Sequence, residues 1–358
     1  MKILILGFTK IKYLPYLHLY LENLDLNAND VHVVLWDRDG EADETINAPV
    51  ALHTYRRTLK TGIPRSKKIG AFLGYRKFVK AVLRQERFDF VIAMHTFPGV
   101  LLADVLRRRF KGRYIYDYRD KTFEDLFFFR HIIHGIVKHS YATLVSSDGF
   151  RAFLPKQSNI YTVHNFLAAS LSHRPAAPSK RTDEPLRLSF WGMVRPESLN
   201  KRLIELLKDD VRFELHYYGT KFAIVERLEA YARECGAKNV FFHGTYVSTD
   251  RYEFAAQTHL LHNLYENDTV QCAMGNKYYD GLMFYLPQIC ARGSFMGEAA
   301  EKAGVGLLCD VTDEGFADTL YTYYKALDFD TFRACCDKEL DRILLEQENT
   351  LSLIRALR

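Results

Sequence analysis

Short runs of apolar residues alternate with longer amphipathic segments along the chain. Segments such as Gly70–Gln85 and Gly99–Arg109 space their apolar residues close to the 3.6-residue period of a helix. The alternation predicts a parallel sheet with helices on both faces, and near-continuous apolarity is typical of strands that are buried on both sides. The strands expected in the first half are Lys2–Leu6, Val31–Leu35, Phe90–Met94, Arg113–Tyr116 and Ala142–Val145.

The alternation stops at residues 172–186, which contain three prolines and five charged residues and predict a linker or hinge. It then restarts. The expected strands are Leu186–Trp191, Phe213–Tyr218, Val240–His243, Leu260–Leu264, Gln288–Ala291 and Gly306–Leu308. The expected helices are Leu199–Lys208, Ile224–Glu234, Asp250–Ala256, Tyr278–Phe284 and Met296–Ala303.

We therefore predict an α/β protein with two Rossmann-like, doubly wound domains that face a cleft. The first domain comprises residues 1–171 and the second residues 187–330, with the linker between them. A helical tail, residues 331–358, carries an apolar stripe that should pack back on the domains. Sheets of this kind bind ligands at the C-terminal ends of their strands.

The composition is that of a globular protein, with 48% apolar and 26% charged residues among 358. No apolar run approaches the roughly 20 residues that a membrane-spanning helix needs. The first residues predict a strand rather than a secretion signal. The six cysteines lack metal-ligand spacing, which favours reduced thiols without structural zinc or disulfides. We expect a cytoplasmic protein.

Positive charge is concentrated in the first half of the chain. Residues 1–170 hold 26 Lys and Arg against 16 Asp and Glu, and residues 171–358 hold 23 against 28. Within Arg56–Arg87, 11 basic residues interleave with apolar ones. This pattern suits peripheral binding to an anionic membrane surface, although a solvated helix face has the same pattern. Nucleic acid is not expected as a partner, because no base-reading module accompanies the charge.

Two segments of the second half contain candidate anion-binding groups. A strand is expected to end at Gly192, and Arg195 and Lys201 follow around the start of the next helix, an arrangement suited to a diphosphate. Further on, Gly275 and Asn276 should cap a helix that carries Asp280 one turn later. The alternative for the first segment is a turn glycine with surface cations. The alternative for the second is an ordinary capped helix, whose dipole favours an acidic residue without any ligand.

The order of these motifs resembles the donor half of GT-B glycosyltransferases, in the large retaining group that uses nucleotide sugars. The likeness also rests on Tyr217–Gly219, Phe242–Thr245 and Asn276–Leu282, and it covers roughly residues 186–310. It departs from the family at Cys272, where the first of two glutamates is usual. The sugar and the stereochemical outcome therefore stay open.

The resemblance implies a role for each matching position. Arg195 and Lys201 would hold the donor diphosphate, and Asp280 would bind the ribose. Gly192 and Gly275 would form backbone walls around the phosphates. The donor motifs also include Tyr218, Asn276 and Lys277.

Candidate groups for the acceptor lie in the first half. His95, at the end of an expected strand, could act as a general base or hold the sugar, and Asp120 is the alternative base. Alternatively, His95 is a packed structural residue, and Asp120 pairs with Arg119. The apolar run Leu126–Phe129 could contact lipid, or it could pack in the core of the protein. Two Asp-x-Asp patterns, at Asp37 and Asp328, lie outside the expected donor site, so no metal is required.

The expected activity is transfer of a hexose from a nucleotide diphosphate donor, a UDP-sugar. The acceptor would be a lipid-linked or saccharide molecule in cell-surface polysaccharide synthesis. Two alternatives keep the fold: a nucleotide-sugar epimerase, and a non-catalytic donor-binding subunit, for which Cys272 is the argument.

Overall fold

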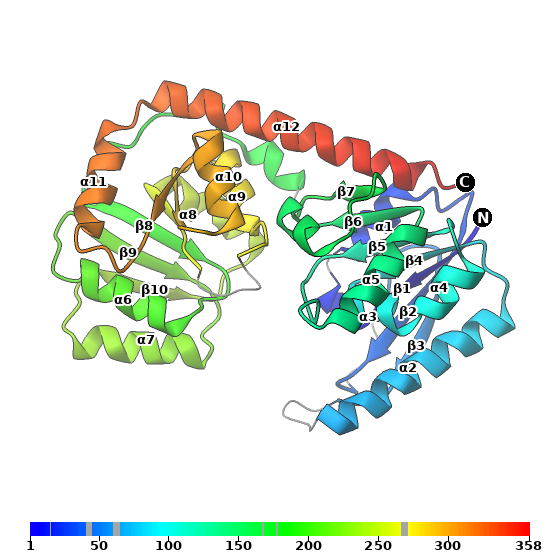
Figure 1. Cartoon of the computed structure of the whole chain (residues 1–358). Helices are drawn as coiled ribbons and strands as arrows, with labels where there is room; N and C mark the ends of the chain where they lie inside the picture. Colours follow the sequence, from blue (N-terminus) through cyan, green and yellow to red (C-terminus); the bar gives the residue numbers. More distant parts are fainter. Residues whose placement is uncertain (15, 41–44, 60–64, 167, 177, 266–270) are drawn as a thin grey trace. The chain divides into compact units, whose positions relative to one another are not determined.

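The computed structural model describes residues 1–14, 16–40, 45–59, 65–166, 168–176, 178–265 and 271–358. The chain forms two compact units. The first comprises Met1–His164 together with Leu345–Arg358, and the second comprises Asn165–Leu344. Each unit contains one parallel sheet with helices on both faces (Figure 1). The predicted α/β class with two doubly wound units is confirmed.

The first unit has a seven-stranded sheet in the order β3-β2-β1-β4-β5-β6-β7. Its strands are β1 (Lys2–Leu6), β2 (Asp30–Asp37), β3 (Val50–Arg56), β4 (Phe90–Met94), β5 (Tyr114–Tyr118), β6 (Ala142–Val145) and β7 (Ile160–Thr162). Its helices are α1 (Leu17–Asn23), α2 (Arg65–Gln85), α3 (Thr96–Leu101), α4 (Ala103–Arg109) and α5 (Phe127–His139).

Alternate side chains of the first sheet face two helical layers. Ile3 and Ile5 pack with Leu17 of α1 and with Ile354, near the C-terminus, in one buried cluster. Helices α2 to α5 cover the other face (Figure 1). Both faces are therefore shielded from water, which explains why the strands are almost continuously apolar.

The second unit has a six-stranded sheet in the order β10-β9-β8-β11-β12-β13. The strands are β8 (Leu186–Trp191), β9 (Phe213–Tyr218), β10 (Val240–Gly244), β11 (Leu260–Asn263), β12 (Gln288–Ala291) and β13 (Gly306–Cys309). The helices are α6 (Glu197–Leu207), α7 (Ala223–Glu234), α8 (Arg251–Gln257), α9 (Asn276–Met283), α10 (Phe295–Ala303) and α11 (Phe316–Ala326).

Helices α6, α7 and α11 bury their apolar stripes on one face of the second sheet, around Leu188 and Phe190. Helices α8, α9, α10 and the first part of α12 (Phe329–Arg355) cover the other face, around Trp191. Because neighbouring residues of β8 point to opposite faces, Phe190 and Trp191 belong to different core clusters.

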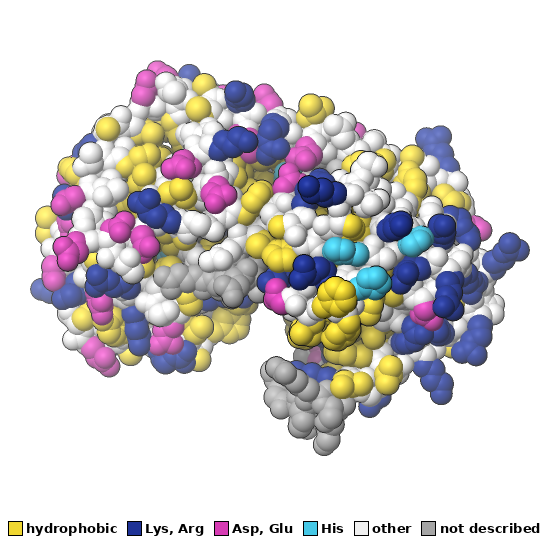
Figure 2. Space-filling view, in the orientation of Figure 1, with side chains coloured by type: hydrophobic (Ala, Val, Ile, Leu, Met, Phe, Trp, Pro, Cys, Tyr) yellow, Lys and Arg dark blue, Asp and Glu magenta, His cyan; other side chains and the backbone are white. Residues whose placement is uncertain are grey.

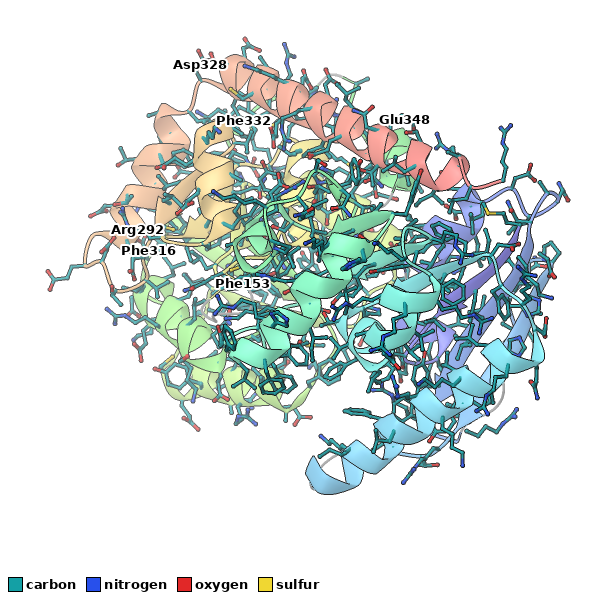
Figure 3. The ribbon with its side chains drawn as sticks, turned by 45° about the vertical axis from the view of Figure 1, so that its right-hand side comes forward. Phe153, Arg292, Phe316, Asp328, Phe332 and Glu348 are labelled. Carbon is teal, nitrogen blue, oxygen red and sulfur yellow. The ribbon has the colours of Figure 1, made fainter. Side chains whose placement is uncertain are left out.

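The long helix α12 contributes to both units. Asp328 and Phe332 mark its beginning and Glu348 lies toward its other end (Figure 3). Leu340 and Ile343 are buried in the second unit's core, whereas Ile354 belongs to the first unit's core. The expected tail is thus a single helix that completes two cores.

Residues 172–186 differ from the expected linker, because the structure assigns them to the second unit. Lys180 donates hydrogen bonds to the carbonyl oxygens of Lys325 and Leu327, at 2.9 and 2.7 Å. The unit boundary instead falls between His164 and Asn165. Prolines and charges mark an irregular segment, but they do not tell whether it packs on a neighbour.

The apolar face of α2 packs on the first sheet. Tyr75, Val79 and Val82 are at most 3% exposed, and Tyr75 donates a hydrogen bond to the carbonyl oxygen of Gly7. Only Ile69 and Leu73 are exposed apolar residues among the described side chains of this helix, residues 68–85. The part of Arg56–Arg87 at residues 60–64 lies outside the described residues. Among the described residues, no helix is long and apolar enough to cross a membrane.

Candidate functional site

The order of the strands places a candidate ligand site in each unit. In the second sheet the order reverses between β8 and β11, and in the first sheet it reverses between β1 and β4. At such a reversal the following connections leave in opposite directions, so the carboxyl ends of the two strands border an open crevice. Gly192 follows β8 and His95 follows β4. Sequence-predicted residues thus lie at both reversal points.

Glycines allow close backbone approach at the end of β8. Gly192 has φ of +115°, and a Cβ atom built on it would meet no other atom within 4 Å. Gly219, after β9, lies against it, because a Cβ there would be 2.2 Å from the carbonyl oxygen of Gly192. A ligand can therefore approach the backbone of Gly192 without meeting a side chain.

Lys277 brings a buried positive charge to the first turn of α9. It is 7% exposed, its Nζ lies 4.0 Å from the centre of the Phe190 ring, and it contacts the hydroxyl of Tyr265. Among the described residues, its ammonium forms no ion pair. A buried cation with no carboxylate partner among the described side chains, beside the positive end of a helix dipole, favours an anionic ligand.

Asp280 is held by two residues that sequence reasoning did not identify. Its carboxylate accepts hydrogen bonds from Trp191 at 2.8 Å and from Arg251 at 2.9 and 3.1 Å. Asp280 is 2% exposed, and its burial raises its pKa while the Arg251 guanidinium opposes that shift. Both oxygens are thus engaged within the protein. The expected contact of Asp280 with a ribose stays a prediction. It requires that a ribose hydroxyl replace Trp191 or Arg251 as a hydrogen-bond donor to the carboxylate.

The two cations predicted to hold a diphosphate have different surroundings. Arg195 is exposed and, among the described residues, has no hydrogen-bond or ion-pair partner. Lys201 lies 3.0 Å from Glu197 and over the ring of Tyr231 on α7, at 5.1 Å. Arg195 is therefore available to an anion, whereas Lys201 must leave Glu197 to reach one.

The remaining predicted donor residues also differ in how far they are available to a ligand. Gly275 precedes α9 and Asn276 is its exposed first residue, so both flank the helix N-terminus as expected. The ring of Tyr218 is stacked between those of His243 and Phe254, with centroids 4.2 and 4.1 Å away. Because both faces of this ring are covered, only its edge can meet a nucleotide.

His95 and Asp120 come together in the first unit. Nδ1 of His95 lies 3.9 Å from a carboxylate oxygen of Asp120, at the carboxyl ends of β4 and β5. His95 has φ of +68°, an uncommon conformation for a residue with a side chain, and such strain concentrates at functional sites. Burial lowers the pKa of His95, so its imidazole is neutral near pH 7 and can accept a proton.

A buried network lies on the same strand end. Asp117 accepts hydrogen bonds from Arg119 at 2.8 Å and from Tyr20 at 2.7 Å. Arg119 also lies over the ring of Tyr16, which is near His95 with ring centroids 6.5 Å apart. Arg119 pairs with Asp117, and the alternative pair of Asp120 with Arg119 is not formed among the described residues. Asp120 is 69% exposed at its side chain and thus free to face a substrate.

Sequence reasoning missed Trp191, Arg251 and Tyr265, which orient the first turn of α9. Arg251 and Tyr265 are single residues outside the motifs, and Arg251 is 29 positions from its partner. A tryptophan directly before the glycine at the strand end was the available signal.

The fold is that of GT-B glycosyltransferases. A glycosyltransferase from Rickettsia africae superposes with a TM-score of 0.69 and 10% identity over 99% of this chain and 98% of its own. HepE of Anabaena, solved in complex with UDP, gives 0.68 and 13% with both chains fully covered. Sucrose-phosphate synthase of Thermosynechococcus elongatus gives 0.67 and 14% over 99% and 96%. The predicted resemblance is confirmed as one of fold.

No protein-family model matches the sequence, and no curated protein matches it.

Proposed function

We propose that this chain is a glycosyltransferase that moves a sugar, a hexose, from a UDP-sugar donor to a lipid-linked or saccharide acceptor in cell-surface polysaccharide synthesis. The observation that carries the proposal is Lys277, a buried cation without a carboxylate partner among the described residues, at the strand reversal of the second unit. The fold supports it, because HepE has this fold and was solved with UDP and with UDP-glucose.

The donor chemistry needs a site that stabilises a leaving diphosphate. The bond between the anomeric carbon and the diphosphate breaks, positive charge develops on the sugar, and negative charge develops on the diphosphate. Lys277, the N-terminus of α9 and Arg195 supply fixed positive charge for the diphosphate, and the open backbone at Gly192 leaves room for it. A metal ion is not needed for this step.

The acceptor chemistry needs a group that takes the proton of the attacking hydroxyl. His95 serves as this base in the proposal, because its neutral imidazole stands at the strand reversal of the first unit. Asp120 stabilises the imidazolium that forms, since its carboxylate faces Nδ1.

An exposed apolar cluster at the start of α5 favours an acceptor with a hydrocarbon part. Phe127 and Phe128 are 83% and 63% exposed, and Phe123 and Leu126 are each 48% exposed. Figure 2 shows hydrophobic side chains gathered on this side of the first unit, beside Lys and Arg side chains. A lipid-linked acceptor at an anionic membrane surface matches this combination. The most exposed apolar cluster thus lies at the start of α5, whereas most of the α2 stripe is core and only Ile69 and Leu73 of its described side chains are exposed.

Calorimetric titration of UDP into the purified protein tests the donor site. Lys277→Met should weaken binding at least tenfold, because a hydrogen bond from a charged group contributes about 1.5–3 kcal/mol. Arg195→Ala should also weaken it, and Lys201→Ala should do so less because Glu197 already neutralises Lys201. Lys238→Met, an exposed lysine of the same unit, is the control and should bind as the wild type.

Product analysis with UDP-sugars then tests the activity. A transferase releases UDP only when a polyprenyl-linked or free saccharide is added, and His95→Asn should bind UDP normally but lose this release. Epimerised sugar without any acceptor would identify an epimerase, and UDP binding without either product a non-catalytic subunit. Failure of the wild type to bind any nucleoside diphosphate would overturn the proposed function.

A further inference from the structure

Two histidines and two carboxylates meet in the first unit, away from the strand reversal. Nδ1 of His32 in β2 lies 2.8 Å from Nε2 of His53 in β3. The strand register places Val34 opposite His53, so the two imidazoles are diagonal neighbours on one face of the sheet. Nε2 of His32 lies 3.1 Å from an oxygen of Asp30 and 3.6 Å from one of Glu86.

Packing fixes these groups in place. His32 is 6% exposed, its ring stacks on that of His53, and the Phe88 ring meets it edge-on. One ligand atom from each of His32, His53 and Glu86 lies within 4.8 Å of the others. Atoms that share one zinc ion at bonds of about 2.0–2.1 Å lie roughly 3.3 Å apart. The Glu86 carboxylate, which lies 3.6 Å from Nε2 of His32, must therefore turn toward Nδ1 to share an ion with the two facing nitrogens.

The two carboxylates already attract a cation. Nζ of Lys2 lies 3.0 Å from Asp30 and also contacts Glu86. The Lys2 side chain is 27% exposed, so its flexible stem can turn toward solvent and release the carboxylates. A divalent ion would then balance the negative charge that the ammonium balances in this structure.

We propose that His32, His53 and Glu86 bind a divalent transition-metal ion of the zinc class. Two imidazoles and one carboxylate form a donor set that zinc favours, with a fourth position left to water. Nδ1 of His32 and Nε2 of His53 face each other and are the nitrogen ligands. Asp30 accepts a hydrogen bond from Nε2 of His32, which fixes the tautomer that leaves Nδ1 free to bind the metal.

The position of the site indicates a structural role. Lys2 and Asp30 begin β1 and β2, and Glu86 follows α2, so the cluster lies toward the amino-terminal ends of the strands. His95 lies at the carboxyl end of β4, on the opposite edge of the same parallel sheet. The ion joins the edge strand β3 to β2 and to the end of α2, and it takes no part in transfer.

The second unit contains a matched histidine pair that serves as a control. Nδ1 of His216 in β9 lies 2.9 Å from Nε2 of His243 in β10, and its Nε2 lies 3.1 Å from Glu214. These strands occupy the same places in their sheet as β2 and β3. Among the described residues, however, only the first-unit cluster brings three ligand atoms within 4.8 Å.

Zinc titration of the untagged, EDTA-treated and dialysed chain tests the site, with a chromophoric chelator as competitor. The wild type should bind one equivalent of Zn²⁺, and Co²⁺ in its place should give the visible absorption bands of a tetrahedral site. His53→Gln should weaken Zn²⁺ binding at least tenfold, whereas His243→Gln should leave it unchanged. Lys2→Met should strengthen it severalfold, because it removes the competing ammonium.

Absence of stoichiometric Zn²⁺ binding to the wild type would overturn the proposal. Unchanged affinity in His53→Gln would do the same, as would loss of affinity in His243→Gln. Far-ultraviolet circular dichroism checks that each variant folds. Glu86→Gln, at a half-buried position, is the second variant if His53→Gln does not fold. The outcome is independent of UDP binding, so it neither supports nor contradicts the transferase function.

Discussion

His262 shows how the second unit accommodates a buried titratable side chain. It is fully buried, its Nδ1 accepts a hydrogen bond from the backbone N–H of Leu264 at 3.1 Å, and its Nε2 lies 3.3 Å from Oδ1 of Asn200. A neutral imidazole satisfies both contacts. Burial, assisted by the charge of Lys277, lowers the pKa of His262 to about 3.

This pKa predicts a pH-dependent stability of the second unit. Between about pH 6.5 and pH 3 the unfolded chain takes up a proton at His262 that the folded chain does not bind, so the free energy of unfolding falls as the pH is lowered. The contribution is about 1.4 kcal/mol per pH unit. His262→Asn should remove it. Urea unfolding at a series of pH values measures the slope of the unfolding free energy against pH. It is followed by tryptophan fluorescence in a Trp36→Phe background, where Trp191 of the second unit is the sole tryptophan.

The matched control is His131→Asn, at an exposed position of the first unit, which should keep the wild-type slope. Equal slopes for the wild type and His262→Asn between pH 6 and pH 4.5 would contradict the prediction.

At the scale of elements, the candidate donor site depends on how closely strand ends and helix starts approach. The hydrogen bond from Trp191 to Asp280 ties the end of β8 to the first turns of α9. The contact of Lys277 with Phe190 ties the same two elements a second time. Gly219 completes the arrangement, because its missing side chain lets the end of β9 lie against Gly192.

Gly219→Ala should separate these two strand ends. The added methyl group would lie 2.2 Å from a backbone oxygen, which cannot rotate away as a side chain can. We expect a loss of about 1–3 kcal/mol in unfolding free energy, together with faster amide exchange at residues 190–193. Hydrogen–deuterium exchange and urea unfolding measure both effects.

Gly315→Ala serves for comparison, since a Cβ atom there meets nothing within 4 Å. If the two alanine variants lose equal stability, the close approach at Gly192 is not the cause.

At the scale of the whole molecule, the last residues belong to the core of the unit that contains the first. Ile354 is fully buried beside Ile3 and Ile5, and Asn29 donates a hydrogen bond to the carbonyl oxygen of Leu357 at 3.0 Å. Thr350 donates a hydrogen bond of 2.6 Å to the carbonyl oxygen of Thr162. The first unit is therefore incomplete until the end of the chain is in place.

Ile354→Ala should destabilise the first unit selectively. Removal of a fully buried isoleucine side chain costs about 2–5 kcal/mol, through lost burial and the cavity left behind. Hydrogen–deuterium exchange should show faster exchange in β1 and β2 but not in β8 and β9. Leu345→Ala, at a residue that is 65% exposed, should leave both units unchanged. Equal acceleration in both units would show that they do not unfold independently.

The local sequence determined most of the elements. Apolar runs identified β1, β4, β6, β8, β9 and β12 with their observed bounds, because strands buried on both faces need apolar side chains throughout. The edge strand β3 was missed, since its residues are mostly half-buried or exposed and carry no such run. The short β7 was missed as well. Glycine and helix-capping patterns were sufficient to place Gly192 and the start of α9, since they reflect backbone geometry.

Only the tertiary structure decided which side chains are available to a ligand. Sequence spacing treats Arg195 and Lys201 alike, yet one is unpartnered among the described residues and the other is paired with Glu197. It likewise gave no sign that Arg251 would engage Asp280, or that His32 and His53 would meet across β2 and β3. Such pairings depend on strand order and register, which bring together residues far apart in the chain, whereas local patterns reflect only the burial and backbone of neighbours in sequence.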